Sequence, residues 1–370
     1  MTASPSMTVA ELRDALDRHD PVTIIDVRPA DQYAEWSIPG SQHIDAYKRL
    51  TAGDRHALDT VEVAAKRPVI TVCAAGRVSM FAAGLLRERG IEAISLAGGM
   101  KAWSLAWNTA EIELPGATSR VIQVRRTGKG CLSYIIGSDG RAVVIDASLD
   151  PGVYLTIAEQ HGWKIAMVVD THIHADHLSR SRMLAERTGA TLRLPGQDRV
   201  HYPFQPLHDG ERLSVGAATL QALSVPGHTN ESMAYLLDKR VLFSGDTLFL
   251  SSVGRPDLEA TANEARERAT ALYHSLQRLL ALPPDTKVLP GHVSEPIPFD
   301  GRLLTTTLGA ARERIDLLRV DEVAFVTNIL RRIPPTPPNH HLIVQANEAG
   351  VFPDGDVTDL EAGANRCAVL

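Results

Sequence analysis

Cysteine is scarce in this sequence, and its few positions do not suggest a disulfide framework. Three cysteines occur among 370 residues, Cys73, Cys131 and Cys367, and they lie far apart. An odd number of widely spaced cysteines indicates a reducing compartment rather than a domain held together by cross-links. The sequence is therefore not that of a small disulfide-rich secreted protein.

Long apolar runs and basic runs are also missing. No apolar stretch reaches the roughly 18 to 20 residues that span a bilayer, and the opening MTASPSMTVAEL lacks a basic and then apolar signal pattern. The formal net charge of -6 gives no electrostatic reason to bind nucleic acid or an anionic membrane. We expect a cytoplasmic protein without a membrane or nucleic-acid partner.

The composition is that of an ordinary soluble globular protein, with 44% hydrophobic and 22% charged residues. A chain of 370 residues exceeds one ordinary hydrophobic core, which predicts at least two domains. Short apolar runs alternate with amphipathic helical patterns, so the predicted fold class is α/β.

The segment VVDTHIHADH, residues 168–177, places four potential metal ligands directly after an apolar run. They are His172, His174, Asp176 and His177, and imidazole and carboxylate groups bind metal ions readily. Residues two apart in an extended chain point to the same side, so His172 and His174 can face one point. The spacing predicts a metal site.

Three later apolar runs each end in another potential ligand. LQALSVPGH ends at His228, RVLFSGD at Asp246 and TKVLPGH at His292. Side chains at the ends of adjacent strands converge at one edge of a sheet. A single histidine of this kind is more often a core residue, but the set favours a shared cation, and these ligand types suit zinc, iron and manganese alike.

The N-terminal segment, residues 1–108, has its chemical focus at RPVITVCAAGRVS. A buried-strand pattern delivers Cys73 into a glycine-containing loop, and an amphipathic helix follows. Loop N–H groups and the positive end of a helix stabilise a thiolate, which is a nucleophile. The alternative interpretation is a small apolar residue at the end of a strand.

IIDVRP, QYAEWSIPGS, CAAGRVS and LAGGMKAW resemble the rhodanese, or sulfurtransferase, domain in order and spacing, over nearly all of residues 1–108. In that family the loop cysteine accepts sulfane sulfur as a persulfide and passes it on, and Cys73 is the matching position. The family's arginine five residues after the cysteine is Val78 here, and Arg77 stands one place earlier. The resemblance therefore implies Arg77 as the substrate-binding residue of this loop.

A second α/β unit follows a linker that we predict at residues 109–118. The motifs HxHxDH, PGHT, SGD and PGH resemble the metallo-β-lactamase fold over residues 119–300, which implies an αβ/βα sandwich of two mixed sheets. Cys131 lies within a predicted strand and is expected to be a buried apolar thiol. The superfamily's seven metal positions are all filled, by His172, His174, Asp176, His177, His228, Asp246 and His292.

THIHADH, PGHTNESMAYLL, FSGDTLFLSSVGRPDL and LPGH are similar to the persulfide dioxygenases, a mononuclear iron branch related to the thioesterase glyoxalase II. The resemblance implies one Fe(II) per chain on His172, His228 and Asp246, with open positions for O2 and a persulfide. It also implies that Arg255 holds the carboxylate of the carrier thiol. The remaining metal-type residues would orient ligands and water: His174, Asp176, His177 and His292.

Residues 301–370 are predicted to form a helical extension and a tail. The helical patterns TTTLGAARERIDLLR and VDEVAFVTNILRR precede a proline-rich stretch. The last residues, DGDVTDLEAGANRCAVL, read as flexible, so we expect Cys367 to be an exposed thiol.

The two resemblances together imply a sulfane-sulfur enzyme. Its metal site would oxidise a low-molecular-weight thiol persulfide with O2 to sulfite, and Cys73 would feed that site or join sulfur to sulfite as thiosulfate. Two alternatives stay open: a two-zinc, glyoxalase II-like hydrolase with an accessory rhodanese domain, and a persulfide sensor whose metal is structural. A homo-oligomer is compatible with the sequence.

Overall fold

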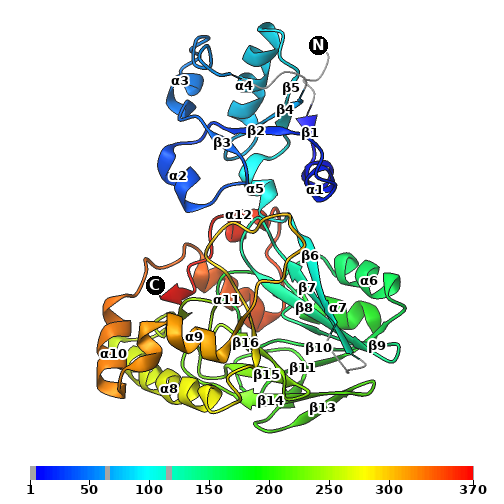
Figure 1. The fold of residues 1–370 in the computed structure, drawn as a ribbon, viewed down its shortest axis with the longest axis vertical. Helices are drawn as coiled ribbons and strands as arrows, with labels where there is room; N and C mark the ends of the chain where they lie inside the picture. Colours follow the sequence, from blue (N-terminus) through cyan, green and yellow to red (C-terminus); the bar gives the residue numbers. More distant parts are fainter. Residues whose placement is uncertain (1–5, 63–66, 114–118, 370) are drawn as a thin grey trace.

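The protein is described by a computed structural model that covers residues 6–62, 67–113 and 119–369. A smaller N-terminal part stands on a larger part, and α5 (Gly99–Trp103) and α12 (Thr358–Glu361) lie where the two meet (Figure 1). None of the helices among the described residues has both the length and the apolar character that a bilayer span requires.

The N-terminal part is built on a parallel five-stranded sheet of order β1-β5-β4-β2-β3. Its strands are β1 (Ser6–Met7), β2 (Thr23–Asp26), β3 (Gln42–His43), β4 (Val69–Val72) and β5 (Ala93–Leu96). Its other helices are α1 (Val9–Asp17), α2 (Ala30–Glu35), α3 (Tyr47–Thr51) and α4 (Arg77–Glu88).

Both faces of this sheet are covered, because neighbouring residues of a strand point to opposite sides. Ile25 packs with Leu86 of α4 on one face. Ile24 packs with Leu12 of α1 and Trp103 of α5 on the other. The central strands are buried throughout, as a parallel sheet between two helical layers requires.

The larger part holds two mixed sheets, a seven-stranded one of order β12-β11-β10-β9-β8-β7-β6 and a six-stranded one of order β13-β14-β15-β16-β18-β19. The first contains β6 (Asn108–Glu113), β7 (Ser119–Arg125), β8 (Leu132–Ser138), β9 (Arg141–Ile145), β10 (Lys164–Val169), β11 (Thr191–Pro195) and β12 (Gln205–Leu207). The second contains β13 (Arg212–Val215), β14 (Ala218–Ser224), β15 (Met233–Leu237), β16 (Val241–Gly245), β18 (Lys287–Pro290) and β19 (Thr306–Thr307).

The two sheets pack face to face and helices cover their outer faces. Tyr134 and Phe243 meet between the sheets in an edge-on aromatic contact with ring centroids 4.9 Å apart. Outside the first sheet lie α6 (Pro151–Gln160) and α7 (Ser181–Thr188), and outside the second lie α8 (Ala262–Leu280) and α10 (Glu322–Arg331). The predicted αβ/βα sandwich is thus confirmed.

The predicted linker at residues 109–118 is wrong for its first half. Residues 109–113 belong to β6, which pairs with β7 over its whole length. Ala110 is buried and Ile112 packs against the core between the sheets. Because these apolar residues alternate with polar ones, the segment forms a strand, and the strand lies at the edge of the sheet. Residues 114–118 lie outside the described part of the chain.

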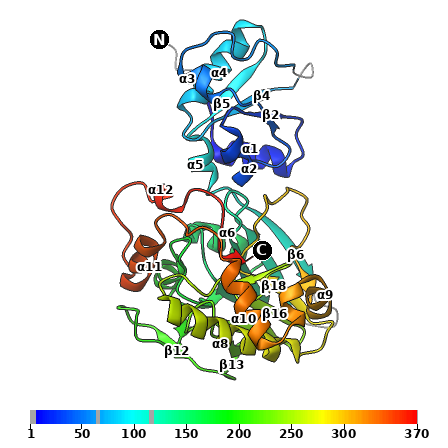
Figure 2. The ribbon, with the colours of Figure 1, turned by 90° about the vertical axis from the view of Figure 1, so that its left-hand side faces the viewer.

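The C-terminal region contains α9 (Leu308–Arg314), the 3-10 turn Asp316–Arg319, α11 (His340–Ala349) and β20 (Ala368–Val369) besides α10 and α12. The predicted flexible tail is wrong, because β20 pairs with β17 (Val253–Gly254). Cys367 is 1% exposed rather than an open thiol. Figure 2 shows the chain running from α12 at the junction back into the larger part.

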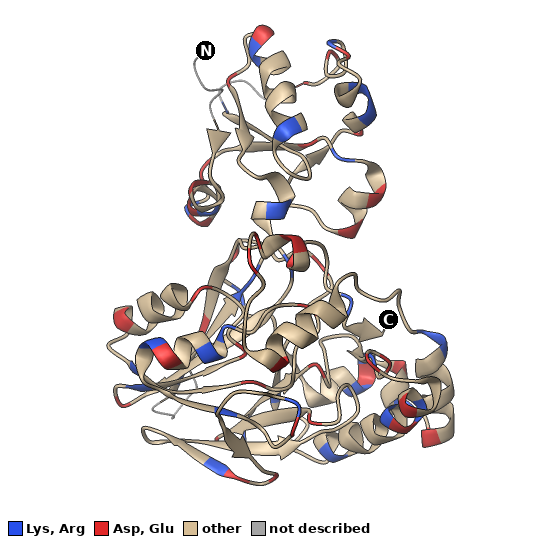
Figure 3. Cartoon of the chain, turned by 180° about the vertical axis from the view of Figure 1, so that it is seen from behind, with Lys and Arg blue, Asp and Glu red and all other residues tan. Residues whose placement is uncertain are grey.

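The junction between the two parts is close-packed and charged. Arg126 donates from Nε to the carbonyl oxygen of Ser104 at 2.7 Å. A Cβ atom on Gly128 would lie 1.8 Å from the carbonyl oxygen of Trp103, so only glycine fits there. Lys101 of α5 pairs with Asp356 at 2.8 Å and with Asp359 at 2.7 Å. Figure 3 shows basic and acidic positions on both sides of the junction.

Gly128→Ala should lower the free energy of unfolding by about 1 to 3 kcal/mol, because the new methyl group meets backbone that cannot move freely. Denaturant unfolding followed by circular dichroism measures it. Gly84→Ala is the matched control, since its Cβ meets nothing nearer than the Arg87 side chain at 4.0 Å. That variant should gain about 0.5 to 1 kcal/mol from helix propensity. Equal stability of the two variants would contradict the packing at the junction.

Candidate metal centre

The predicted metal-ligand residues all lie buried at one edge of the sandwich. The segment that carries His172 to His177 connects β10 to α7. His228 follows β14, Asp246 follows β16 and His292 follows β18. The convergence that we predicted from strand ends is present.

His172, His228 and Asp246 form the first group of ligand atoms. Oδ2 of Asp246 lies 3.9 Å from Nε2 of His172 and 3.7 Å from Nε2 of His228. Nδ1 of His228 donates to the carbonyl oxygen of Arg255 at 2.8 Å, and Nδ1 of His172 lies 2.9 Å from Oγ1 of Thr171. These contacts fix each ring so that its Nε2 lone pair faces the common point.

The first group has the properties of a cation site. Nε2 of His172 and Oδ2 of Asp246 are buried and have no hydrogen-bond partner among the described residues. Burial lowers the pKa of His172 and of His228, so both imidazoles are neutral. Burial opposes ionisation of Asp246, but the nearby His292 outweighs it and holds the pKa of Asp246 below its ordinary value. Two neutral imidazoles and a carboxylate suit a divalent metal ion.

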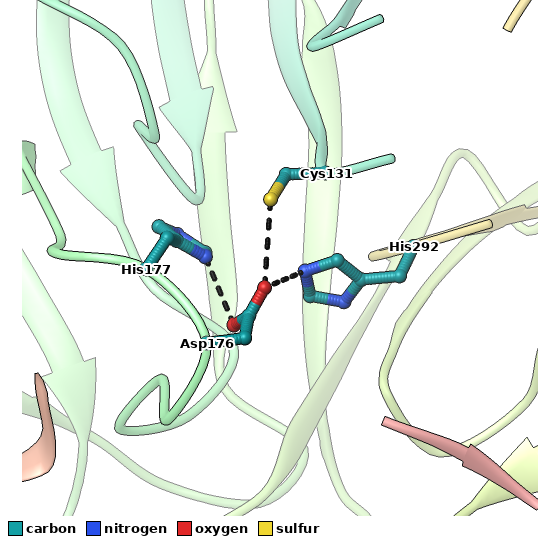
Figure 4. Close-up of side chains that lie close together, drawn as sticks. All are labelled: Cys131, Asp176, His177 and His292. Carbon is teal, nitrogen blue, oxygen red and sulfur yellow. Dashed lines mark hydrogen bonds and ion pairs between the residues drawn. The ribbon is translucent and has the colours of Figure 1, made fainter. Parts of the chain in front are cut away.

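A second group surrounds Asp176 (Figure 4). Its Oδ1 lies 3.0 Å from Nδ1 of His177. Its Oδ2 lies 2.8 Å from Nε2 of His292 and accepts from Asn365 at 2.9 Å and from the Cys131 thiol at 3.5 Å. The residues of this group therefore contact each other, although Nε2 of His177 also has no hydrogen-bond partner among the described residues.

Charges in the second group balance one another. Burial disfavours an ionised Asp176, but His292 and His177 outweigh it and hold its pKa well below the ordinary value. Burial also disfavours a charged His177, yet Asp176 raises its pKa to about 9. Burial and Asp176 oppose a thiolate at Cys131, and the two histidines nevertheless lower its pKa to about 6. His292 joins the groups, since its Nδ1 lies 2.5 Å from Oδ1 of Asp246.

His174 faces away from the first group. Its Nε2 lies 3.2 Å from Oδ1 of Asp146, at the end of β9, and its ring lies against His172 with centroids 4.3 Å apart. Asp146 also accepts the backbone N–H and the hydroxyl of Thr171. His174 and Asp146 thus support the segment that holds His172.

Sequence reasoning missed three residues of this site: Cys131, Asn365 and Cys367. Cys131 immediately precedes the buried strand β8, so a rule that looks for ligands after strands does not find it. Cys367 lies beside Asp246 and His292, with ligand atoms within 4.8 Å of one another. Burial, Asp176 and Asp246 raise the pKa of the Cys367 thiol well above its ordinary value. The sequence around Cys367 is polar and irregular, and it gave no signal that this cysteine would be buried at the site.

The expected role of Arg255 as an anchor for a substrate carboxylate stays a prediction, and the structure gives this arginine other partners. Arg255 is fully buried and its guanidinium forms two hydrogen bonds to Asp257, at 2.8 and 2.7 Å. Its other N–H groups donate to the carbonyl oxygens of Pro334, Pro335 and Arg366. All five donors are used, so Arg255 holds the C-terminal region in place.

Cys73 lies at the junction of strand and helix, as predicted. Its buried Sγ accepts from the backbone N–H of Gly76 at 3.2 Å and from the hydroxyl of Ser79 at 3.3 Å. Arg77 is exposed at the first position of α4. The persulfide chemistry of Cys73 and the binding role of Arg77 stay predictions.

The sandwich and the buried histidine and aspartate groups at its edge define a metallo-β-lactamase-type protein. Residues 8–106 match the sequence model of the Rhodanese-like domain, and residues 126–292 match that of the Metallo-beta-lactamase superfamily. The chain belongs to the metallo-β-lactamase superfamily and carries a rhodanese-like domain before its metallo-β-lactamase domain.

Several relatives are named hydroxyacylglutathione hydrolase. The one from Methylococcus capsulatus is 34% identical over 209 residues, which cover 53% of this chain and 77% of the relative. The one from Xanthomonas oryzae pv. oryzae is 37% identical over 159 residues, and this chain spans only 58% of its length.

Two solved structures share the fold of the larger part. ETHE1 from Myxococcus xanthus is 29% identical with a TM-score of 0.55, over 62% of this chain and 98% of that one. A metallo-beta-lactamase from Staphylococcus aureus is 26% identical with a TM-score of 0.58, over 64% of this chain and 74% of that one.

His228→Ala should weaken metal binding by more than the roughly 10- to 100-fold that is typical for losing an outer partner, because it removes a direct ligand. Metal analysis of the purified variant after dialysis measures the loss. His274→Ala is the control, since His274 is 63% exposed on α8 and pairs with Glu322 rather than with a residue of the site. Undiminished metal content in the His228 variant would exclude the first group as the binding site.

Proposed function

We propose that this protein is a sulfane-sulfur enzyme, an iron-dependent persulfide dioxygenase joined to a sulfurtransferase domain. One observation carries the proposal. Two histidines and one carboxylate, His172, His228 and Asp246, converge with unpartnered ligand atoms beside a second group whose members contact each other.

A ligand set of two histidines and one carboxylate is typical of non-haem Fe(II) oxygenases, which keep open positions on the metal. When bound, iron would supply adjacent positions at which O2 and a persulfide can meet. The overall reaction consumes R–S–SH, O2 and water and releases R–SH, sulfite and two protons. Sulfur is oxidised and O2 is reduced, so no further oxidant is needed.

The residues around the ligands hold this arrangement. Thr171 and the carbonyl of Arg255 orient the two imidazoles. His292 holds the other oxygen of Asp246, which leaves only Oδ2 facing the histidines. His172, His228 and Asp246 would thus hold the cation, and positions that they do not fill would be left to the reactants.

The domain pairing supports sulfur chemistry. A rhodanese-like domain is suited to carry persulfide on Cys73, and a persulfide is the substrate of the proposed oxidation. The likeness to ETHE1 from Myxococcus xanthus and the resemblance of THIHADH and VGRPDL to persulfide dioxygenases agree with this assignment. Arg255 is occupied, so the carrier thiol would be recognised by other groups than a guanidinium at that position.

A two-zinc hydrolase of the glyoxalase II type is the second candidate. Relatives named hydroxyacylglutathione hydrolase favour it. The second group would then hold the other ion through Asp176, His177 and His292, whose ligand atoms lie within 4.8 Å of one another and of the Cys131 thiol. A thiolate and imidazoles suit zinc.

Metal content and oxygen uptake separate these functions. Protein purified without oxygen should hold about one iron per chain and should consume O2 when given glutathione persulfide, with sulfite as product. Asp246→Asn should lose both properties, because it removes the carboxylate charge at the cation. About two zinc ions per chain with thioester hydrolysis would identify the hydrolase. Absence of O2 uptake by the iron-loaded protein would exclude the dioxygenase.

A further inference from the structure

The C-terminal segment, residues 356–369, connects the Cys73 loop to the metal centre. In α5, Lys101 donates its backbone N–H to the carbonyl oxygen of Ala74, which lies in the Cys73 loop. The ammonium group of the same lysine pairs with Asp356 at 2.8 Å and with Asp359 at 2.7 Å. The segment therefore begins in contact with the residues that shape the Cys73 loop.

Farther along, the segment is fixed beside the metal-ligand residues. The buried carboxylate of Glu361 accepts the backbone N–H of Leu178 at 2.6 Å and pairs with Arg126 at 3.0 Å and with Arg180. Leu178 directly follows His177. Separating this buried carboxylate from either arginine would leave an unpaired charge in the interior, which is costly. The ion pairs therefore hold Glu361 in place.

The segment ends inside the metal centre. Asn365 donates to Oδ2 of Asp176 at 2.9 Å and accepts the backbone N–H of Cys367 at 2.8 Å. The Cys367 thiol is buried beside Asp246 and His292. The tail was predicted to be flexible, but its folding places the Cys367 thiol next to Asp246, a proposed metal ligand.

The N-terminal domain presents its Cys73 edge to this region. β2 and β4 run parallel, so the residues after them, including Cys73, lie at the same edge of the sheet. At that edge Arg28 pairs with Asp26 and donates to the carbonyl oxygen of Trp36. Trp36 and its neighbour Glu35 are thereby held on the side where Cys73 lies.

Both of these residues reach the larger domain. The Trp36 ring lies 3.1 Å from the position that a Cβ on Gly130 would take. The Glu35 carboxylate accepts from the guanidinium of Arg366 at 2.6 Å. Cys131 follows Gly130, and Cys367 follows Arg366. The interface thus lies on the two segments that carry these thiols into the metal centre.

We propose that Cys367 is the internal acceptor of sulfane sulfur from Cys73, an inference that rests on the proposed function. The Cys367 sulfur attacks the outer sulfur of the Cys73 persulfide, the S–S bond at Cys73 breaks, and a new S–S bond forms at Cys367. The thiol proton of Cys367 passes to the Cys73 thiolate that leaves. One persulfide and one thiol give one thiol and one persulfide, so no oxidant is required.

Cys367 rather than Cys131 is proposed as the sulfur acceptor because the two thiols lie beside different groups of the metal centre. Cys367 lies beside Asp246, which belongs to the first group. Cys131 contacts Asp176 of the second group. Only sulfur carried on Cys367 would be delivered next to the first group, where the oxidation is proposed.

The test follows sulfur in the intact, full-length protein without oxygen. One equivalent of glutathione persulfide is added, free thiols and persulfides are alkylated at timed intervals, and peptide mass spectrometry reads the three cysteines separately. Label should appear on Cys73 first and on Cys367 next. In Cys73→Ser, label on Cys367 should fall by about tenfold or more, since the relay would deliver that sulfur through Cys73.

Three results would overturn the assignment: label on Cys131 in place of Cys367, no label on Cys367, or equal labelling of Cys367 in Cys73→Ser. The readout needs no O2 chemistry. A failed transfer with normal O2 uptake from glutathione persulfide therefore refutes the relay alone, and a normal transfer without O2 uptake refutes the proposed oxidation.

Charge reversal at the interface tests the route independently. Glu35→Arg places two guanidinium groups together and should slow labelling of Cys367 by about fivefold. The double variant Glu35→Arg with Arg366→Glu should restore the rate. Glu88→Arg is the control, because it breaks a more exposed arginine–glutamate pair, with Arg55, on the same domain. Equal rates in Glu35→Arg and the control would exclude this contact as part of the route.

Discussion

The hydrogen-bonded pair of Asp246 and His292 is the interaction on which the metal centre depends. One oxygen of Asp246 contacts His292, so the other faces His172 and His228. A buried carboxylate needs compensating charge, because desolvation is costly without a partner or a cation. The backbone leaves no spare room here: a Cβ on Gly291 would lie 2.5 Å from Oδ1 of Asp246. The ends of β16 and β18 must therefore approach as they do.

The same constraint explains why two groups with similar residues differ. Asp176 has partners on both oxygens, from His177, His292 and Asn365, whereas Asp246 keeps one oxygen without a hydrogen bond. His292 contacts the carboxylates of both groups, Asp176 and Asp246. The free oxygen of Asp246 beside two neutral imidazoles is the physical basis for proposing a metal ion in the first group.

The C-terminal segment contacts both domains and so helps to hold them together, in addition to the direct contacts at the junction. It pairs with Lys101 of the rhodanese-like domain, with Arg126 and Arg180 of the larger domain, and with Asp176 at the metal centre. Arg255 supports it by binding three backbone carbonyls of the C-terminal region. An arginine that sequence similarity suggests as a substrate anchor is, in this chain, part of the scaffold that carries Cys367.

The sequence by itself determined the two α/β domains, the sandwich and the strand-end ligands, because each depends on local patterns: apolar runs, turns, and ligands at fixed spacing. It also placed Cys73 between strand and helix. Tertiary structure alone decided which ligands meet, since His174 and Asp176 lie two residues apart yet face different partners. It alone turned residues 109–113 into a strand and buried Cys367, because those outcomes depend on contacts with residues distant in sequence, β7 and Asp246 among them.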